Sequence, residues 1–280
     1  MKQGKRVGPS VKCTESDYKT LLIEVGPDKV ATVTLNRPDA LNAFSYQMMS
    51  EFRELWPRIQ QDDDVHAVVL RAAPGRAFST GADVKAAEIE PFVDFSRPFE
   101  QRDPGEYLGP KSNHCWKPVI GAVHGLCCAG AFYWINECDF LIAAENAQFF
   151  DPHVSYGMVA AVEPIGLTYR IPYGEVMRMM LLGNDERVSA QTALRIGLVS
   201  EVLETPEAAW SRAHHLASQI AAKPSIAVQG TVRAVWESQD VPRSTALVQS
   251  FRMPMLGNPL GQAQLDHLTM IRGGKKFETR

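Results

Sequence analysis

The stretch KPVIGAVHGLCCAGAFYWINECD, residues 117–139, contains the pattern that decides the fold. Its first part, KPVIGAVHG, is a short apolar run of the length and composition of a buried strand. A turn of small residues follows, and the apolar segment AFYWINECD continues the chain. We expect Gly130 to open a helix at this point, which predicts a strand, a tight turn and a helix in direct succession.

The segments on both sides repeat this alternation. LLIEVG (21–26) and KVATVTLNR (29–37) are rich in β-branched residues and flank Pro-Asp, which predicts a hairpin. SYQMMSEFRELWPRIQQ (45–61) has apolar residues at helical spacing, with Ser45 as its expected cap. VHAVVLRAA (65–73) predicts a strand, and FLIAAENAQF (140–149) predicts two strands joined by a turn. The order favours an α/β core followed by helices.

The predicted organisation has three parts. Residues 1–18 are expected to form a flexible leader, residues 19–204 the α/β core and residues 205–280 a helical C-terminal region. A chain of 280 residues with 45% hydrophobic residues can bury one large core and a small appended piece. No internal repeat interrupts this order.

Charge and composition exclude several classes of protein. The formal net charge is -3 and no basic stripe is visible, which argues against a nucleic-acid partner. No apolar run reaches the length of a membrane span, and the N-terminus lacks the apolar middle of a secretion signal, so we expect a cytoplasmic protein. The five cysteines form no C-x-x-C pair and are expected to be small buried side chains, with no metal site.

Two glycine-containing turns point to chemistry on a carbonyl group. They lie in GRAFSTGADVKAAE (75–88) and AVHGLCCAGAFYWINECD (122–139). Small residues at such turns leave backbone N–H groups uncovered, and two N–H groups aimed at one point form an oxyanion hole. Taken alone, each turn also fits ordinary strand-to-helix packing. Neither turn matches the phosphate-loop or dinucleotide-binding motifs.

With these segments in place, the chain resembles the crotonase superfamily, also called the enoyl-CoA hydratase/isomerase family. The similarity runs from about Val30 to Val202. It rests on five motifs in the family's order: TLNRPDALNAF, AFSTGADVK, KPVIGAVHGLCCAGA, CDFLIAAENAQF and RVSAQTALRIGLV.

The resemblance implies a spiral of ββα turns with a helical C-terminal region that builds a homotrimer or a dimer of trimers. It implies a CoA thioester as substrate, with no separate cofactor. The thioester oxygen would lie between the backbone N–H groups of Ala82 and Gly130. Relatives have three glycines at the second turn, where this chain has Ala129-Gly130-Ala131. The added methyl groups would narrow the pocket without removing the N–H group.

The same resemblance implies where coenzyme A would bind. In relatives the segment after the NRP motif and the GAD segment line the pantetheine and adenine. The matching positions here, in addition to the oxyanion residues, are Leu41, Ala43, Asp83, Val84 and Lys85. Lys85 could reach a phosphate, although an ordinary solvated surface lysine explains this residue better.

Two glutamates that bracket the water in hydratases of the family are absent. The first position, three residues after the oxyanion glycine, is Tyr133, and the second is His153. Histidine is suited to proton transfer near neutral pH, and it works better when a carboxylate holds its other nitrogen. Glu163 is the first candidate for that carboxylate and Asp151 the second. In the 6-oxocamphor hydrolase branch, which this segment resembles, a histidine works with an acid about nine residues further on.

Tyr133 is expected to donate a hydrogen bond or a proton from the opposite side, and Glu137, one helical turn on, could share its face. Three functions remain open. The first is an enoyl-CoA hydratase or isomerase, favoured because this chemistry is the commonest on the scaffold. The second is a hydrolase of a carbon–carbon bond in a β-diketone or cyclic β-ketoacyl-CoA, and the third a non-catalytic acyl-CoA binder.

Overall fold

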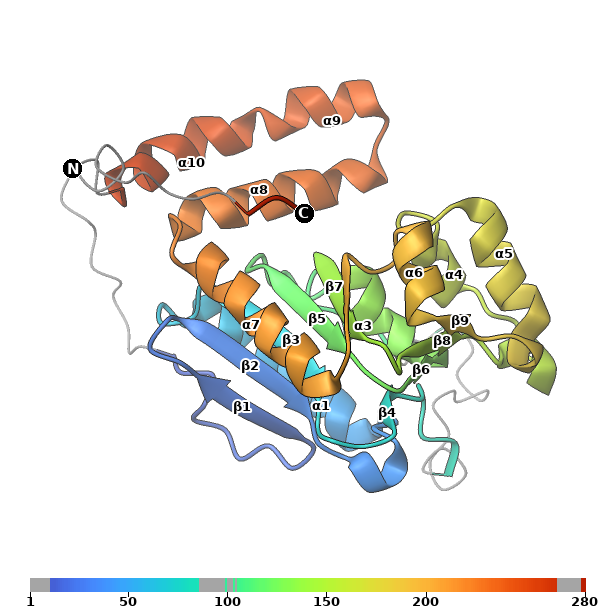
Figure 1. Ribbon diagram of the computed structural model, residues 1–280. Coiled ribbons are helices and arrows are strands. Elements are labelled where there is room, and N and C mark those ends of the chain that lie inside the picture. Colours follow the sequence, from blue (N-terminus) through green and yellow to red (C-terminus); the bar gives the residue numbers. More distant parts are fainter. Residues whose placement is uncertain (1–10, 86–98, 100–102, 104, 266–277) are drawn as a thin grey trace. The chain divides into compact units, whose positions relative to one another are not determined.

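Six strands build the larger sheet, in the order β1-β2-β3-β5-β7-β10 (Figure 1). The computed structural model describes residues 11–85, 99, 103, 105–265 and 278–280. The strands are β1 (Leu21–Val25), β2 (Val30–Leu35), β3 (Ala67–Ala72), β5 (Val119–Val123), β7 (Phe140–Ala144) and β10 (Glu201–Leu203). β1 and β2 form the predicted antiparallel hairpin, while every other neighbouring pair is parallel.

A four-stranded sheet continues the chain path at the ends of these strands, in the order β4-β6-β8-β9. Its members are β4 (Ala77–Ser79), β6 (Leu126–Cys128), β8 (Gln148–Phe150) and β9 (Val188–Ser189). Each of β3, β5 and β7 is therefore followed by a short strand of the second sheet. This repetition confirms the expected ββα core with a helical C-terminal region.

The central strands β3, β5 and β7 of the larger sheet are buried on both faces, as their apolar composition requires. Along β3, Val68 and Leu70 face the main core, whereas Ala67 and Val69 belong to a second cluster on the opposite face. Helix α7 (Pro206–Ala221) covers that second face, and Figure 1 shows it lying across the sheet. It contributes a stripe of alanines, whose small side chains allow close packing: Ala209, Ala213, Ala217 and Ala221.

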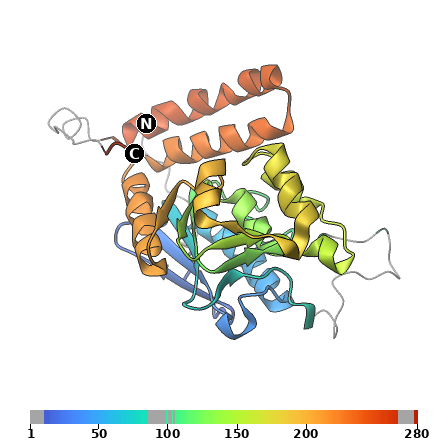
Figure 2. The ribbon, with the colours of Figure 1, turned by 45° about the vertical axis from the view of Figure 1, so that its right-hand side comes forward.

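Helices and short 3-10 turns connect the strands of the core. Helix α1 (Tyr46–Gln61) begins after Ser45, whose hydroxyl accepts a hydrogen bond from the Met48 N–H, which confirms the predicted cap. The other elements are η1 (Pro38–Ala40), η2 (Ala129–Ala131), α3 (Phe132–Glu137), η3 (His153–Tyr156), α4 (Val162–Leu167), α5 (Tyr173–Leu182), η4 (Gly183–Asp185) and α6 (Ala190–Ile196). Figure 2 shows α4, α5 and α6 gathered beside the smaller sheet.

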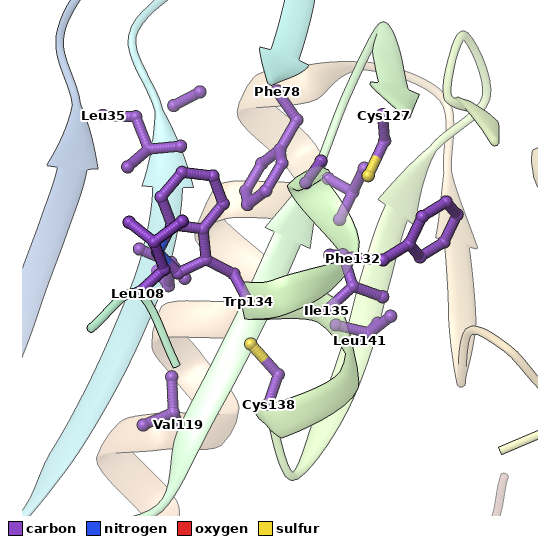
Figure 3. Packing of buried hydrophobic residues seen from close by; sticks show 14 of the residues in the cluster. Leu35, Phe78, Leu108, Val119, Cys127, Phe132, Trp134, Ile135, Cys138 and Leu141 are labelled. Carbon is purple, nitrogen blue, oxygen red and sulfur yellow. The ribbon is translucent and has the colours of Figure 1, made fainter. Parts of the chain in front are cut away.

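Aromatic packing around α3 forms the centre of the main core (Figure 3). Trp134 is fully buried and meets Phe78 edge to face, with ring centroids 6.4 Å apart. Phe132 points to the other side of α3 in Figure 3 and is also fully buried. Because close-packed aromatic rings tolerate little displacement, α3 is held rigidly against the sheet. The residues directly before α3 are therefore held in place as well.

Residues from Ala222 onward form a second compact unit of helices. It contains α8 (Ser225–Glu237), η5 (Ser238–Asp240), α9 (Arg243–Ser250) and α10 (Arg252–Ala263), with α8 and α10 packed together. At one close contact, Gly261 lies beside Ala227. Within the part of the chain that the structure describes, no helix is both long and apolar enough to cross a membrane.

Two expected boundaries differ from the structure. The first compact unit ends at Ala221, because α7 packs on the sheet, whereas the sequence placed the boundary after residue 204. The expected leader, residues 1–18, is not loose in its last third. Cys13 is fully buried there, and its N–H donates to Asp62 Oδ2 at 3.0 Å. Residues 1–10 and 266–277 lie outside the described residues. The five cysteines are all buried and free, as predicted.

Candidate active site

The two predicted turns lie against each other. Gly81 has a φ of 83°, a conformation that favours glycine, and a Cβ added there would lie 2.6 Å from the Gly130 nitrogen. The same atom would lie 2.8 Å from Ala129 Cβ. Ala129 itself has a positive φ of 51°, so both turns use left-handed backbone at the point where they meet. The sequence positions 82 and 130, 48 residues apart along the chain, are thereby brought to one place.

The backbone pairing of Phe44 sets the direction of the Ala82 amide. The Phe44 N–H donates to the Gly81 carbonyl at 2.8 Å, and the Asp83 N–H donates to the Phe44 carbonyl at 2.9 Å. In an extended chain successive N–H groups point to opposite sides. The Ala82 N–H therefore points away from residue 44. Residues 86–88 of the first turn's motif lie outside the described residues.

Glycine is the residue type that fits position 130 without displacing its neighbours. A Cβ at this residue would lie 2.6 Å from Cε1 of Phe44, which is fully buried beneath it. Phe44 also packs edge to face on Trp134 and on Tyr133, so the ring cannot move aside easily. The sequence marked Gly130 for its turn, but the close contact with Phe44 is visible only in the fold.

Three side chains gather beyond the end of β8. Asp151 follows β8 directly and is fully buried, His153 opens η3, and Glu163 lies in the first turn of α4. His153 Nδ1 bonds Asp151 Oδ1 at 2.6 Å, and His153 Nε2 lies 3.9 Å from Glu163 Oε1. Both carboxylates proposed from the sequence are thus near His153, one on each ring nitrogen. The direct hydrogen bond belongs to Asp151, the candidate that was placed second.

The surroundings raise the pKa values of both proton-transfer candidates, His153 and Glu163. The hydrogen bond to Asp151 raises the pKa of His153 above its usual value, against the opposing effect of burial. Burial raises the pKa of Glu163, against the opposing effect of His153. The two shifts have the same direction for different reasons, since one partner is stabilised when charged and the other is destabilised when charged.

Helix α4 is held on α3 by Asn136, which sequence reasoning missed. Its side-chain amide donates to the Glu163 carbonyl at 3.0 Å, and Gly166 leaves the room that this contact needs. The Asn136 carbonyl accepts hydrogen bonds from Arg170 Nε at 3.1 Å and Nη2 at 2.7 Å. Arg170 also donates to the Cys138 carbonyl and so satisfies the end of α3. These contacts hold α4 against α3 and so fix the position of Glu163 relative to His153.

Tyr133 lies in the site but its proton is already committed. Its hydroxyl donates to Asp103 Oδ1 at 2.6 Å, and its ring lies against Gly105, where a Cβ would overlap it. Burial and Asp103 raise the pKa of Tyr133. Glu137 lies on the same face of α3 as Tyr133, since the first contacts Gly109 and the second Gly105. Its carboxylate accepts hydrogen bonds from the N–H groups of Lys111 and Ser112 and from the Ser112 hydroxyl, because α3 ends beside that loop.

The expected coenzyme A residues lie on two adjoining segments. The Thr80 N–H donates to the Leu41 carbonyl at 3.2 Å, and Leu41 and Asn42 both have positive φ, 51° and 53°. Arg37 joins the segments, because it donates to the Ala43 carbonyl and forms an ion pair with Asp83 at 2.8 Å. Asp83 is thus occupied by a protein partner. Val84 and Lys85 are exposed beside it.

A divalent metal ion has a possible set of ligands here. Asp151, His153 and Glu163 each offer one ligand atom, and these atoms lie within 4.8 Å of one another. The Asp151–His153 hydrogen bond occupies Nδ1, which leaves Nε2 and the Glu163 carboxylate as the pair facing each other. A metal held by this pair alone would have fewer protein ligands than tightly bound zinc usually has.

The two mostly parallel sheets define an α/β protein, and the His–carboxylate cluster is the candidate site for its chemistry. The chain belongs to the enoyl-CoA hydratase/isomerase family, which it matches over residues 26–259. It is 34% identical to (E)-benzylidenesuccinyl-CoA hydratase of Thauera aromatica, covering 79% of this chain and 84% of that one. It is 31% identical to short-chain-enoyl-CoA hydratase of Clostridium acetobutylicum, covering 89% and 94%.

Solved structures agree with this assignment. An enoyl-CoA hydratase/isomerase from Mycobacterium paratuberculosis superimposes with a TM-score of 0.78 at 35% identity, covering 90% of this chain and 94% of that one. An enoyl-CoA hydratase from Mycobacterium smegmatis also gives 0.78, at 26% identity, covering 90% and 96%. The chain is therefore a crotonase-type acyl-CoA enzyme, and the resemblance seen in its motifs is confirmed.

Proposed function

We propose that this enzyme adds water to the double bond of an α,β-unsaturated acyl-CoA, with His153 and Glu163 replacing the two glutamates of its relatives. The observation that carries the proposal is the 3.9 Å separation of His153 Nε2 and Glu163 Oε1. Hydrogen bonds to water are about 2.8 Å long, so one water molecule placed beside the pair, at the third corner of a triangle, can contact both atoms at once. Relatives named as hydratases support the same reaction class.

The two groups have complementary roles in the addition. The His153 imidazolium, favoured by Asp151, donates its Nε2 proton to the α-carbon of the substrate. The Glu163 carboxylate accepts a proton from the water, whose oxygen bonds to the β-carbon. The step leaves a neutral imidazole and a neutral carboxyl group. The proton then returns from Glu163 to His153, which restores the starting state without any further reactant.

The thioester oxygen would become negative during this step. The Ala82 amide, which points away from Phe44, and the Gly130 amide, which lies against Gly81, support an oxyanion hole at the meeting point of the turns. Coenzyme A would follow the joined segments that contain Leu41, Ala43 and Asp83. Coenzyme A is then part of the substrate, and the balanced proton transfer calls for no other cofactor.

A second candidate is hydrolysis of a carbon–carbon bond in a β-diketone or cyclic β-ketoacyl-CoA. The direct Asp151–His153 hydrogen bond favours it, because a histidine held by a carboxylate is a good general base for water. The third candidate, a non-catalytic binder, is disfavoured by two carboxylates placed on both nitrogens of one histidine.

The deciding experiment supplies the purified enzyme with short-chain, long-chain and aryl enoyl-CoA substrates, and separately with cyclic β-diketones and β-ketoacyl-CoA. We expect loss of the enoyl chromophore and formation of the 3-hydroxyacyl-CoA, identified by mass. Ring opening or chain cleavage, with no hydration of any enoyl-CoA, would replace the proposal by the second candidate.

We also propose assembly as a homotrimer or a dimer of trimers. A group of exposed apolar side chains, of the kind that marks protein–protein interfaces, lies on η3, α4, α5 and the segments between them. They are Tyr156, Met158, Val159, Val162, Ile165, Tyr169 and Tyr173.

Light scattering should give three or six times the chain mass. The paired change Val159→Glu and Ile165→Glu should lower that mass, while Thr14→Glu should not. A monomeric wild-type protein contradicts this prediction.

A further inference from the structure

Asp151 contacts both the backbone and the ring of His153. Its Oδ1 accepts two hydrogen bonds from the same residue, one from the His153 N–H at 3.0 Å and one from Nδ1 at 2.6 Å. The residue is fully buried, and its Oδ2 has no hydrogen-bond partner within the described part of the chain. A buried carboxylate oxygen without a partner is costly, so the nearby His153 ring is its main compensation.

The backbone that holds Asp151 is rigid. It directly follows β8, which pairs with β6 on one side and β9 on the other. The preceding Phe150 is buried and lies beneath the Arg187 guanidinium, 4.6 Å from it. The carboxylate therefore has little freedom to follow the imidazole, and the imidazole must align with the carboxylate.

This alignment decides which nitrogen faces the reacting atoms. With Nδ1–H donated to Asp151, Nε2 is left to face Glu163. In the other tautomer, with the proton on Nε2, Nδ1 would face the Asp151 carboxylate oxygen with no hydrogen atom between them. Without Asp151, nothing in these contacts would select one arrangement of the ring over the other.

We propose that Asp151 is the positioning residue of the site, which holds His153 with Nδ1 protonated so that Nε2 delivers the proton, while Glu163 acts on the water. The inference rests on the proposed hydration. It gives the two carboxylates different roles, because Asp151 acts through His153 whereas Glu163 acts on the reactant. Neither carboxylate can replace the other, because Asp151 is bound to Nδ1 and only Glu163 lies near Nε2, the nitrogen that faces the reactants in this proposal.

The charged and titratable groups around His153 set the expected pH response. They are Asp151 on the same segment, Glu163 on α4, Tyr133 on α3 with its partner Asp103, and Cys128 and Arg187 near Asp151. As the acid, His153 must be protonated, so activity falls as the pH rises through its pKa. Removing the Asp151 charge lowers that pKa, and the alkaline limb of activity then moves to lower pH.

The test is Asp151→Asn, which keeps the size of the side chain. We expect the alkaline limb of the kcat profile to move by about one pH unit or more, with KM nearly unchanged. Glu51→Gln is the matched control, because Glu51 is a buried carboxylate that holds Lys19 and Thr20 far along the chain. It should lower thermal stability and leave the limb in place. An unmoved limb in a folded Asp151→Asn enzyme overturns the inference.

A measurement on the wild-type enzyme covers the case in which the variant does not fold. Nitrogen-15 NMR of the histidine ring, assigned with His153→Gln, should show Nδ1 protonated and Nε2 as the titrating nitrogen. Protonation of Nε2 alone in the neutral ring overturns the inference. Failure of the proposed function is distinct, because the wild-type enzyme would then hydrate no enoyl-CoA, whichever nitrogen of His153 carries the proton.

Discussion

Replacement of His153 by alanine should lower kcat for enoyl-CoA hydration by about 10²–10⁴-fold, the range that general acid–base catalysis supplies. The imidazole is the one group of the site whose two nitrogens contact both carboxylates, so its loss removes the acid and leaves Glu163 without its counterpart. KM should change little, because His153 lies in the loop after β8, apart from the joined segments around Arg37. Steady-state kinetics on the best enoyl-CoA substrate gives both values.

The control for this variant is His215→Ala, an exposed histidine on α7 that should leave kcat unchanged. Glu163→Gln should reproduce most of the loss, since an amide cannot accept the water proton. An enzyme that keeps more than a tenth of its kcat after either active-site change would refute the assigned roles.

The same two groups predict a bell-shaped pH profile for the wild-type enzyme. The base, Glu163, must be ionised, so activity falls as the pH drops through its raised pKa. The acid, His153, must be protonated, so activity falls as the pH rises through a pKa that lies above the ordinary histidine value. Glu163→Gln should remove the acidic limb and leave the alkaline one.

Replacement of Ala82 by proline should lower kcat by about 10²–10³-fold, the effect of removing one oxyanion donor. Proline has no N–H, and the Phe44 bridge uses the Gly81 carbonyl and the Asp83 N–H, neither of which the substitution deletes. The lost hydrogen bond should therefore appear in the chemical step, whereas any strain that the proline ring places on Gly81 should appear in stability. Kinetics and a thermal unfolding curve, measured on the same sample, separate the two.

Ala82→Ser is the matched control, because it keeps the N–H and adds only a hydroxyl. It should retain most of the activity. Gly130→Ala tests the second turn in a different way: its added methyl would lie 2.6 Å from Phe44 Cε1 and should displace the turn. If Ala82→Pro is folded and loses less than threefold in kcat, the Ala82 amide does not hold the thioester oxygen.

Local patterns allowed most of the fold to be predicted. The β1–β2 hairpin, the Ser45 cap of α1 and the strands β3, β5, β7 and β8 followed from periodicity and turn residues close together in the chain, whereas the ββα spiral was implied by the family resemblance. The boundary after α7 was missed, because the alanine stripe that binds α7 to the sheet resembles any other helical composition. Whether a helix packs on one unit or another depends on a surface that it meets far away in the sequence.

The candidate site likewise contains residues that the sequence predicted and residues that only the structure revealed. His153 and Glu163 were found by their positions in the motif, and the structure brings them together. Arg37, Asn136 and Asp103 were missed, since each acts through a partner more than 20 residues away. Tyr133 was assigned a proton donor's role, but the hydroxyl faces Asp103, a contact that its own helix does not reveal.

The sequence alone determined which elements form and which residue types stand at the two turns and at positions 133 and 153, because those features depend on neighbours a few residues apart. Only the tertiary structure decided which carboxylate holds His153 and which one faces its free nitrogen. The sequence alone does not distinguish the roles of Asp151 and Glu163, because both are acidic residues close to His153 in the chain. They differ because β8 ends beside Nδ1 while α4, held on α3 by Asn136, brings Glu163 to Nε2.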